Sequence, residues 1–124
     1  MQDQPSPSAI LGLAIAQLNA IDPQGGRAKF EMRMVAAAMQ LVQRALDLAP
    51  KAEAAERQRL TALLNAEGDT ESLNRRLCVL IRDGQLTLAD ASLAAHLRAT
   101  TMEKLAVDQP TYASYRRALE RSKG

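Results

Sequence analysis

Aromatic residues are almost absent from this 124-residue chain, which contains no Trp, one Phe and two Tyr. A hydrophobic core must therefore be built mainly from Leu, Ala and Met, and the 47% content of hydrophobic residues is high enough to form one. Ala-rich faces let helices approach closely, and Ala, Leu, Met, Gln, Glu and Arg all favour helix formation. No segment shows the alternation of apolar and polar residues that is typical of a strand. The composition thus predicts an all-α protein.

Cysteine and histidine each occur once, as Cys78 and His96. One cysteine cannot form an internal disulfide and is typical of a reducing compartment, and the two residues have no recognisable metal-ligand spacing. No run reaches the roughly 18 apolar residues of a membrane span. The apolar segment AILGLAIAQLNA lacks the preceding basic residue of a signal peptide. We therefore expect a cytoplasmic protein that binds no metal, no cofactor and no membrane.

Neither sign of charge dominates, because 16 Lys and Arg residues face 14 Asp and Glu residues, for a net charge of +2. Acidic and basic residues are interspersed along the chain, whereas a nucleic-acid-binding surface normally contains a basic stripe. We therefore expect no nucleic-acid partner. Most of the cations are Arg, which favours specific contacts with carboxylates or phosphates.

Breaking residues and apolar periodicity predict five or six helices in a single domain spanning residues 1–124. The first helix should begin at the Ser6–Pro7 capping pair and end near Asn19, before IDPQGGR. The second, over about 28–49 and closed by Pro50, is the longest and should lie at the centre of the bundle. Its apolar residues recur at every third or fourth position, at Phe30, Met34, Ala37, Leu41, Ala45 and Leu48. The stripe expected on the first helix comprises Ile10, Leu11, Ala14 and Leu18.

The rest of the chain is divided by similar signals. A third helix should end at Gly68, and Asp69 or Thr70 should cap a fourth helix that Gly84 stops. A fifth should run from near Asp90 to just before Pro110, followed by a short terminal helix. Residues 1–5 and 118–124 are expected to be loose.

The spacing of His96, Thr100 and Glu103, at i, i+4 and i+7 of one helix, superficially resembles a catalytic triad. His96 and Glu103 are two turns apart, about 10 Å along the axis, whereas a catalytic base must lie within about 3 Å of its partner. The apolar stripe of this helix (Leu93, Leu97, Thr101, Leu105) is expected on another face. We interpret His96 as a structural or interface residue, with a ligand contact as the alternative.

Two arginines of the second helix, Arg33 and Arg44, flank its apolar stripe. An arginine in such a position must pair with a carboxylate or reach a partner, because an unpaired buried charge is costly. An ion pair within the chain is the favoured interpretation, and a ligand or interface role is the alternative. Candidate carboxylates are Asp83, Asp90, Glu103 and Asp108. The segment GGRAK, which includes Arg27 and Lys29 at the start of this helix, is a candidate for an anion site, with an ordinary loop and helix start as the favoured interpretation.

Three segments resemble a small bacterial domain family of undetermined mechanism: FEMRMVAAAMQLVQRALDLAP, LNRRLCVLIRDGQL and LAAHLRATTMEKLAVDQPTYASYR. The resemblance spans about residues 9–116, and the last segment is its most specific part. The family pattern commonly has Asn where this chain has Ala37, and Glu where it has Ala45. The residues that follow the pattern include Arg33, Arg44, His96, Arg98, Thr100, Lys104, Tyr112, Tyr115 and Arg116.

Members of that family are typically encoded beside an aminoglycoside-phosphotransferase-like kinase and an acyl-CoA dehydrogenase. The resemblance implies a non-catalytic accessory subunit of a kinase that acts on hydroxyacyl-CoA-type substrates, with the dehydrogenase as a further partner. Tyr and Arg often anchor interfaces, so the nine residues above are the candidate interface or ligand contacts. A stand-alone protein that binds CoA or an acyl-CoA, through Arg33, Arg98 and the helix start at Gly26, is the alternative. Self-association into a homodimer is left open.

Overall fold

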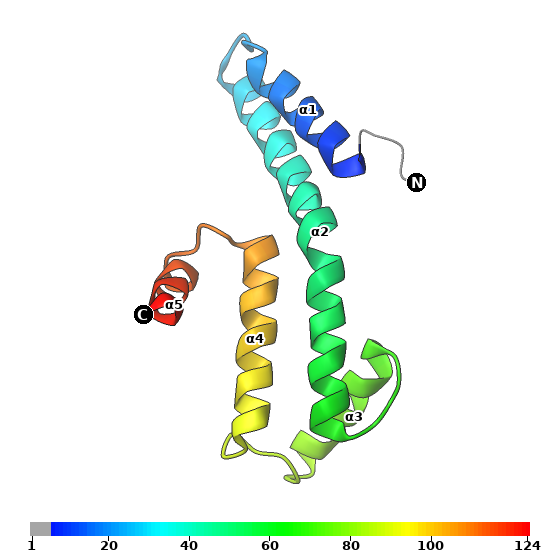
Figure 1. Ribbon diagram of the computed structural model, residues 1–124. Helices are drawn as coiled ribbons and strands as arrows, with labels where there is room; N and C mark the ends of the chain where they lie inside the picture. The colour runs from blue at the N-terminus through cyan, green and yellow to red at the C-terminus, as the bar shows by residue number, and fades with distance from the viewer. Residues whose placement is uncertain (1–5) are drawn as a thin grey trace. The chain divides into compact units, whose positions relative to one another are not determined.

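The computed structural model describes residues 6–124, which form five helices and no strand (Figure 1). The helices are α1 (Pro7–Ala20), α2 (Gly26–Leu64), α3 (Thr70–Arg82), α4 (Ala91–Asp108) and α5 (Ala113–Lys123). The prediction of an all-α protein with five or six helices is thereby confirmed. Residues 1–5, expected to be loose, lie outside the described part of the chain. No helix within that part is long and apolar enough to cross a membrane.

Several helix ends follow directly from the local sequence. The Ser6 hydroxyl accepts a hydrogen bond from the Ala9 amide at 3.2 Å, and Pro7 occupies the first helical position of α1. The Asp69 carboxylate caps α3 by accepting from the Ser72 amide at 2.8 Å. Gly84 follows α3 with a φ of +73°, a conformation that favours glycine. All three signals were correctly predicted from the sequence.

The prediction that Pro50 closes the second helix is wrong, because α2 continues through it to Leu64. Proline lacks the amide that would bond to the carbonyl four residues earlier, which typically costs about 3 kcal/mol inside a helix. The strong helix formers of KAEAAERQRL follow at once, with no turn residue until Asn65. Asn65, with a φ of +47°, terminates α2, so the expected end at Gly68 is also wrong. The second and third predicted helices are one helix.

The chain forms two compact units, and α2 contributes a segment to each. The N-terminal unit ends at Leu48 and contains α1 with the first segment of α2. Its α1 buries Ile15, not the expected Ala14, and the side-chain amide of Gln43 on α2 donates to the Ser8 carbonyl at 3.2 Å. The buried or half-buried positions of this segment of α2 include Ala28, Met32, Ala36, Met39 and Gln43. We infer that this set faces α1.

The stripe predicted to form the core of the second helix is largely exposed. At about 100° per residue, this stripe lies on the side of α2 opposite the set that faces α1. The fractional exposures are 63% for Phe30, 58% for Met34, 39% for Leu41 and 41% for Leu48. Ile10 of α1, also expected in the core, is 55% exposed. The prediction failed because this segment is apolar on more than one face, and α1 covers only one of them.

The C-terminal unit, from Ala49 to Gly124, contains the main hydrophobic core. The end of α2 packs there against α3 and α4, and Leu60 and Leu93 are almost completely buried. The core residues are Leu60, Leu64, Leu73, Leu77 and Leu93. His96 follows Leu93 by one turn of α4 and is likewise buried, with 4% exposure. We expected His96 to lie on a different face of α4 from the apolar stripe. This expectation is wrong, because His96 is buried on the same side as Leu93, whereas Leu97 of that stripe is exposed.

Candidate functional site

The most extensive polar network described connects Arg59 of α2 to one face of α4. The Arg59 guanidinium donates from Nη1 to Glu103 Oε1 at 2.9 Å and from Nη2 to Glu103 Oε2 at 2.7 Å. Nη2 also donates to the Thr100 hydroxyl at 3.2 Å, and Nε donates to His96 Nδ1 at 3.4 Å. These are the same three residues whose spacing on α4 drew attention in the sequence. They are joined by an arginine rather than by contacts with one another.

Helix geometry explains why one arginine can reach three residues. Positions i, i+4 and i+7 form a row along α4, and the Arg59 side chain extends from α2 across that row. A guanidinium has five N–H groups in a planar fork, and this network uses four of them. The Arg59–Glu103 pair is bidentate, which is the strongest arrangement for these groups. The network thus holds α2 and α4 together in the C-terminal unit.

The electrostatic effects follow from this geometry. The hydrogen bond with Glu103 raises the pKa of Arg59, and the nearby charges of Glu103 and Glu56 act in the same direction. Burial lowers the pKa of His96, and the positive charge of Arg59 lowers it further. His96 Nδ1 accepts a hydrogen bond, so the proton of the neutral ring lies on Nε2. The network therefore favours a neutral histidine beside a permanently charged arginine.

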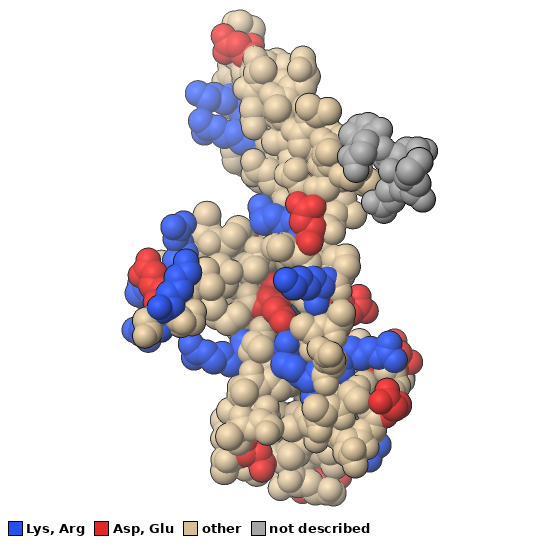
Figure 2. Space-filling view, in the orientation of Figure 1, with Lys and Arg blue, Asp and Glu red and all other residues tan. Residues whose placement is uncertain are grey.

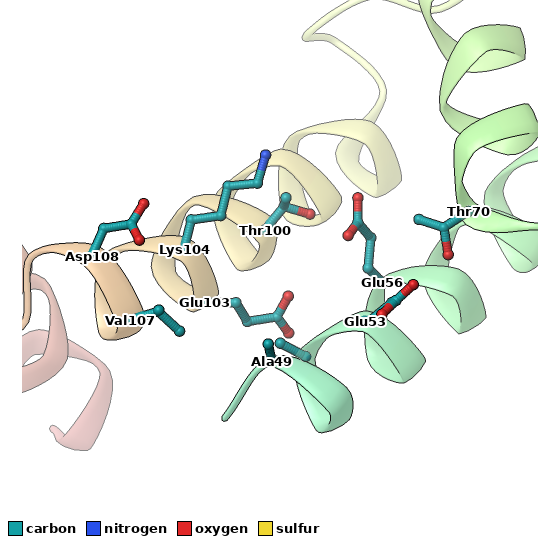
Figure 3. Close-up of a pocket in the computed structure, with 10 residues that line it drawn as sticks. Ala49, Glu53, Glu56, Thr70, Thr100, Glu103, Lys104, Val107 and Asp108 are labelled. Carbon is teal, nitrogen blue, oxygen red and sulfur yellow. The ribbon is translucent and has the colours of Figure 1, made fainter. Parts of the chain in front are cut away.

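An open groove of about 340 Å³ lies beside this network, between the second segment of α2 and the C-terminal half of α4 (Figure 3). Glu56 and Glu103 point into the space between the two helices, and Glu56 also accepts a hydrogen bond from Asn74 at 3.0 Å. Ala49, Ala52 and Val107 supply apolar walls. The charged residues that line the groove are Glu53, Glu56, Glu103, Lys104 and Asp108.

Four carboxylates and one ammonium group make this groove acidic. An acidic surface repels phosphate groups, so the groove does not suit the phosphates of CoA. Among residues 6–124, no three His, Cys, Asp or Glu side chains are grouped in a way that could hold a metal ion. The carboxylate nearest the network, Glu103, already binds Arg59 through both oxygens.

The candidate residues from the sequence fall into both units. Arg33 and Arg44 belong to the N-terminal unit, and the other seven belong to the C-terminal unit. His96 and Thr100 contact Arg59, and Lys104 lines the groove. Arg98, Tyr112 and Arg116 are exposed, and Tyr115 is half-buried.

The partner of Glu103 was not predicted. Glu103 was a candidate partner for Arg33 or Arg44, but it pairs with Arg59. Asp90, the N-cap residue of α4, pairs with neither arginine through an ion pair, and its carboxylate accepts from the Thr87 amide at 2.8 Å. Arg33 has no hydrogen bond or ion pair with any residue from 6 to 124.

A signal for Arg59 was present in the sequence. It directly precedes the core residue Leu60 and lies on the same side of α2 as Glu56, three residues earlier. A polar row at i, i+4 and i+7 facing a core requires a donor from another helix. Arg59 is half-buried in the structure, whereas Arg57 of the same segment is exposed.

Comparison with known protein families identifies the family of this chain. Residues 23–112 match a domain of unknown function, DUF6285, and because this is most of the chain, the protein belongs to that family. The match confirms the resemblance to a family of undetermined mechanism. No curated protein and no solved structure matches the chain.

Proposed function

We propose that this DUF6285 protein is a non-catalytic accessory subunit. Its proposed partner is an aminoglycoside-phosphotransferase-like kinase that acts on hydroxyacyl-CoA-type substrates in acyl-CoA catabolism. An acyl-CoA dehydrogenase is the proposed further partner. The identities of both partners rest on the family resemblance of the segments around Arg33, His96 and Tyr112.

The observation that carries the interaction role is the surface of α1. This helix contains no charged residue in its 14 positions, PSAILGLAIAQLNA. Leu13 is 68% exposed. Ile10 of α1 and Ile21, the residue directly after α1, are each more than half exposed. The surface over α1 is free of charged side chains on the face shown in Figure 2. A helix that is apolar all round is normally buried, and an exposed apolar patch usually marks a partner surface.

The polar network supports a role without catalysis. A general base needs a free lone pair, and a nucleophile needs an adjacent base. His96 uses Nδ1 to accept from Arg59, and Glu103 uses both oxygens for the same purpose. The hydroxyl of Thr100 accepts from Arg59 as well. These groups are arranged to hold two helices together.

Co-expression with an aminoglycoside-phosphotransferase-like kinase tests the proposal. We expect the two proteins to co-purify and the accessory protein to raise kinase activity or solubility. Leu13→Glu should abolish co-purification by placing a charge in the apolar patch. Leu88→Glu is the matched control, because Leu88 is 75% exposed and lies in the C-terminal unit. A kinase that neither binds this protein nor changes its activity with it would contradict the proposal.

A small-molecule binder is the alternative, favoured by a hollow of about 150 Å³ in the N-terminal unit. Lys29 and Arg33 line it together with apolar residues of α1, α2 and the turn between them. Two cations near a helix start suit a phosphate group. Of the three parts of the expected site, only Arg33 lines this hollow, and neither Arg98 nor Gly26 does.

A thermal-shift measurement tests this alternative. CoA and acetyl-CoA should raise the melting temperature of the isolated protein, whereas pantetheine, which lacks the phosphates, should not. Arg33→Gln should remove the shift. No shift at millimolar CoA would eliminate this alternative and leave the accessory role unaffected.

A further inference from the structure

In the N-terminal unit, α1 does not cover the exposed stripe of α2. Its large apolar members are Phe30, Met34, Leu41 and Leu48, which are between 39% and 63% exposed. Together with Ala37, these residues are spaced by four, three, four and seven positions along α2. This repeat is typical of a helix that packs along another helix. Because α1 packs on the opposite side of α2, it leaves this stripe available.

One edge of the stripe carries Arg33, Gln40 and Asp47, which are spaced by seven residues and are all exposed. In paired helices, side chains along such an edge face the edge of the partner helix and determine its identity and orientation. The edge is basic at one end, neutral in the middle and acidic at the other. When two copies of this helix lie antiparallel, the basic end of one edge faces the acidic end of the other.

We infer that a second copy of this chain covers the stripe, with the two α2 segments antiparallel and related by a two-fold axis near Gln40. Equivalent edges face each other in an antiparallel pair. Arg33 then faces Asp47 of the second copy, and Asp47 faces Arg33 of that copy. Gln40 faces its own equivalent, and an amide side chain can both donate and accept. A two-fold axis makes both ion pairs form together.

The state of these side chains in the described chain agrees with this arrangement. Arg33 makes no hydrogen bond or ion pair with residues 6–124, so its guanidinium is available. On the other edge, Glu31 already accepts from Arg27 at 3.1 Å within the same helix. A parallel pair would bring Arg33 toward that satisfied edge and would give it no new carboxylate. The charges therefore favour the antiparallel pair.

This dimer does not depend on the proposed kinase, because it uses α2 rather than the exposed face of α1. Sedimentation equilibrium or light scattering on the isolated full chain should give a mass near twice 13.5 kDa. A concentration of about 100 µM is sufficient for a dissociation constant in the micromolar range. A monomer at that concentration would overturn the inference.

The orientation is tested by charge reversal. Arg33→Asp alone places Asp against Asp twice, and Asp47→Arg alone places Arg against Arg twice. Each variant should dimerise about tenfold more weakly than the native chain, since two favourable pairs become two repulsive ones. Mixing the two variants should restore dimers, because both pairs become favourable in the mixed species. The double variant should also dimerise like the native chain.

A second variant tests the stripe itself. Met34→Glu should give a monomer whose circular dichroism matches that of the native chain, because Met34 is exposed within one chain. Val79→Glu is the matched control, since Val79 is 48% exposed but lies on α3, and it should remain dimeric. A dimer that survives Met34→Glu, or that charge reversal and mixing leave unchanged, would place the contact elsewhere and overturn the inference.

Discussion

Arg59 and Glu103, 44 residues apart in the chain, form two hydrogen bonds of 2.9 and 2.7 Å between guanidinium and carboxylate. Each side chain is about one quarter exposed. The pair lies between α2 and α4 beside the buried His96. It is thus a tertiary contact near the core, unlike the two other described ion pairs, which join residues one helical turn apart.

Removing this pair should weaken the fold. Arg59→Met should lower the free energy of unfolding by about 2 kcal/mol, because three acceptors on α4 lose their donor while the aliphatic volume is kept. Glu103→Gln should cost about 1 kcal/mol, since a neutral amide retains part of the bonding. A double-mutant cycle by urea unfolding should give a coupling of about 1 kcal/mol or more.

The exposed pair of Arg75 and Glu71 on α3 supplies the matched control. Both side chains are about three-quarters exposed, and they are four residues apart on one helix. Arg75→Met should change stability by less than about 0.5 kcal/mol. If Arg59→Met were equally mild, the network would not hold α2 and α4 together.

The burial of His96 predicts a dependence of stability on pH. Its folded pKa is lowered, so below the unfolded pKa of about 6.5 the unfolded chain binds a proton that the folded chain resists. The stability that depends on neutral His96 is fully present above pH 6.5. It should fall as the pH drops below that value and level off below the folded pKa.

Urea unfolding between pH 7.5 and pH 5 measures this effect. His96→Asn is the control, because its carbonyl oxygen can replace Nδ1 as the acceptor for Arg59 and does not titrate. The variant should lose less stability than the native chain over this range. Parallel curves for the two proteins would show that another group causes the dependence.

Replacing the proline inside α2 should stabilise the helix. Pro50→Ala restores an amide that can donate to the carbonyl of Leu46 and removes the clash of the ring with that carbonyl. The free energy of unfolding should rise by about 1–3 kcal/mol, with an increase in melting temperature. An unchanged or lower melting temperature would mean that the proline is favourable at the boundary between the two units.

The turn after α3 should tolerate only glycine well. Gly84 has a φ of +73°, and a Cβ added there would meet no atom within 4 Å, so backbone strain alone would act. Gly84→Ala should cost about 1 kcal/mol. Gly26→Ala is the control, because that position has equal space and no positive φ. Equal stability of the two variants would contradict this explanation.

The helix ends that the sequence predicted correctly share one physical property. The Ser6 cap, the Asp69 cap and the Gly84 stop each depend on hydrogen bonds or dihedral angles within about four residues. The incorrect prediction that Pro50 ends the second helix also relied on a local signal. A local breaking signal was weaker than the helix-forming residues on both sides of it.

The face of each helix that became buried was harder to predict. In α2, Ala36 and Met34 belong to two different apolar stripes. Only the packing of α1 decides that Ala36 becomes buried and Met34 stays exposed. In α4, His96 was expected away from the core, yet it is buried because Arg59 satisfies its polar nitrogen. Periodicity identifies candidate faces but does not show which neighbour covers them.

The sequence by itself determined the helical class, most helix boundaries and the row of His96, Thr100 and Glu103, because these follow from contacts between near neighbours. Only the tertiary structure decided that Arg59 joins this row and that the stripe of Phe30, Met34 and Leu41 remains exposed. Both outcomes depend on which distant helices pack together. That choice is made by the burial of Leu60 against Leu93 in one unit and of Ile15 beside α2 in the other.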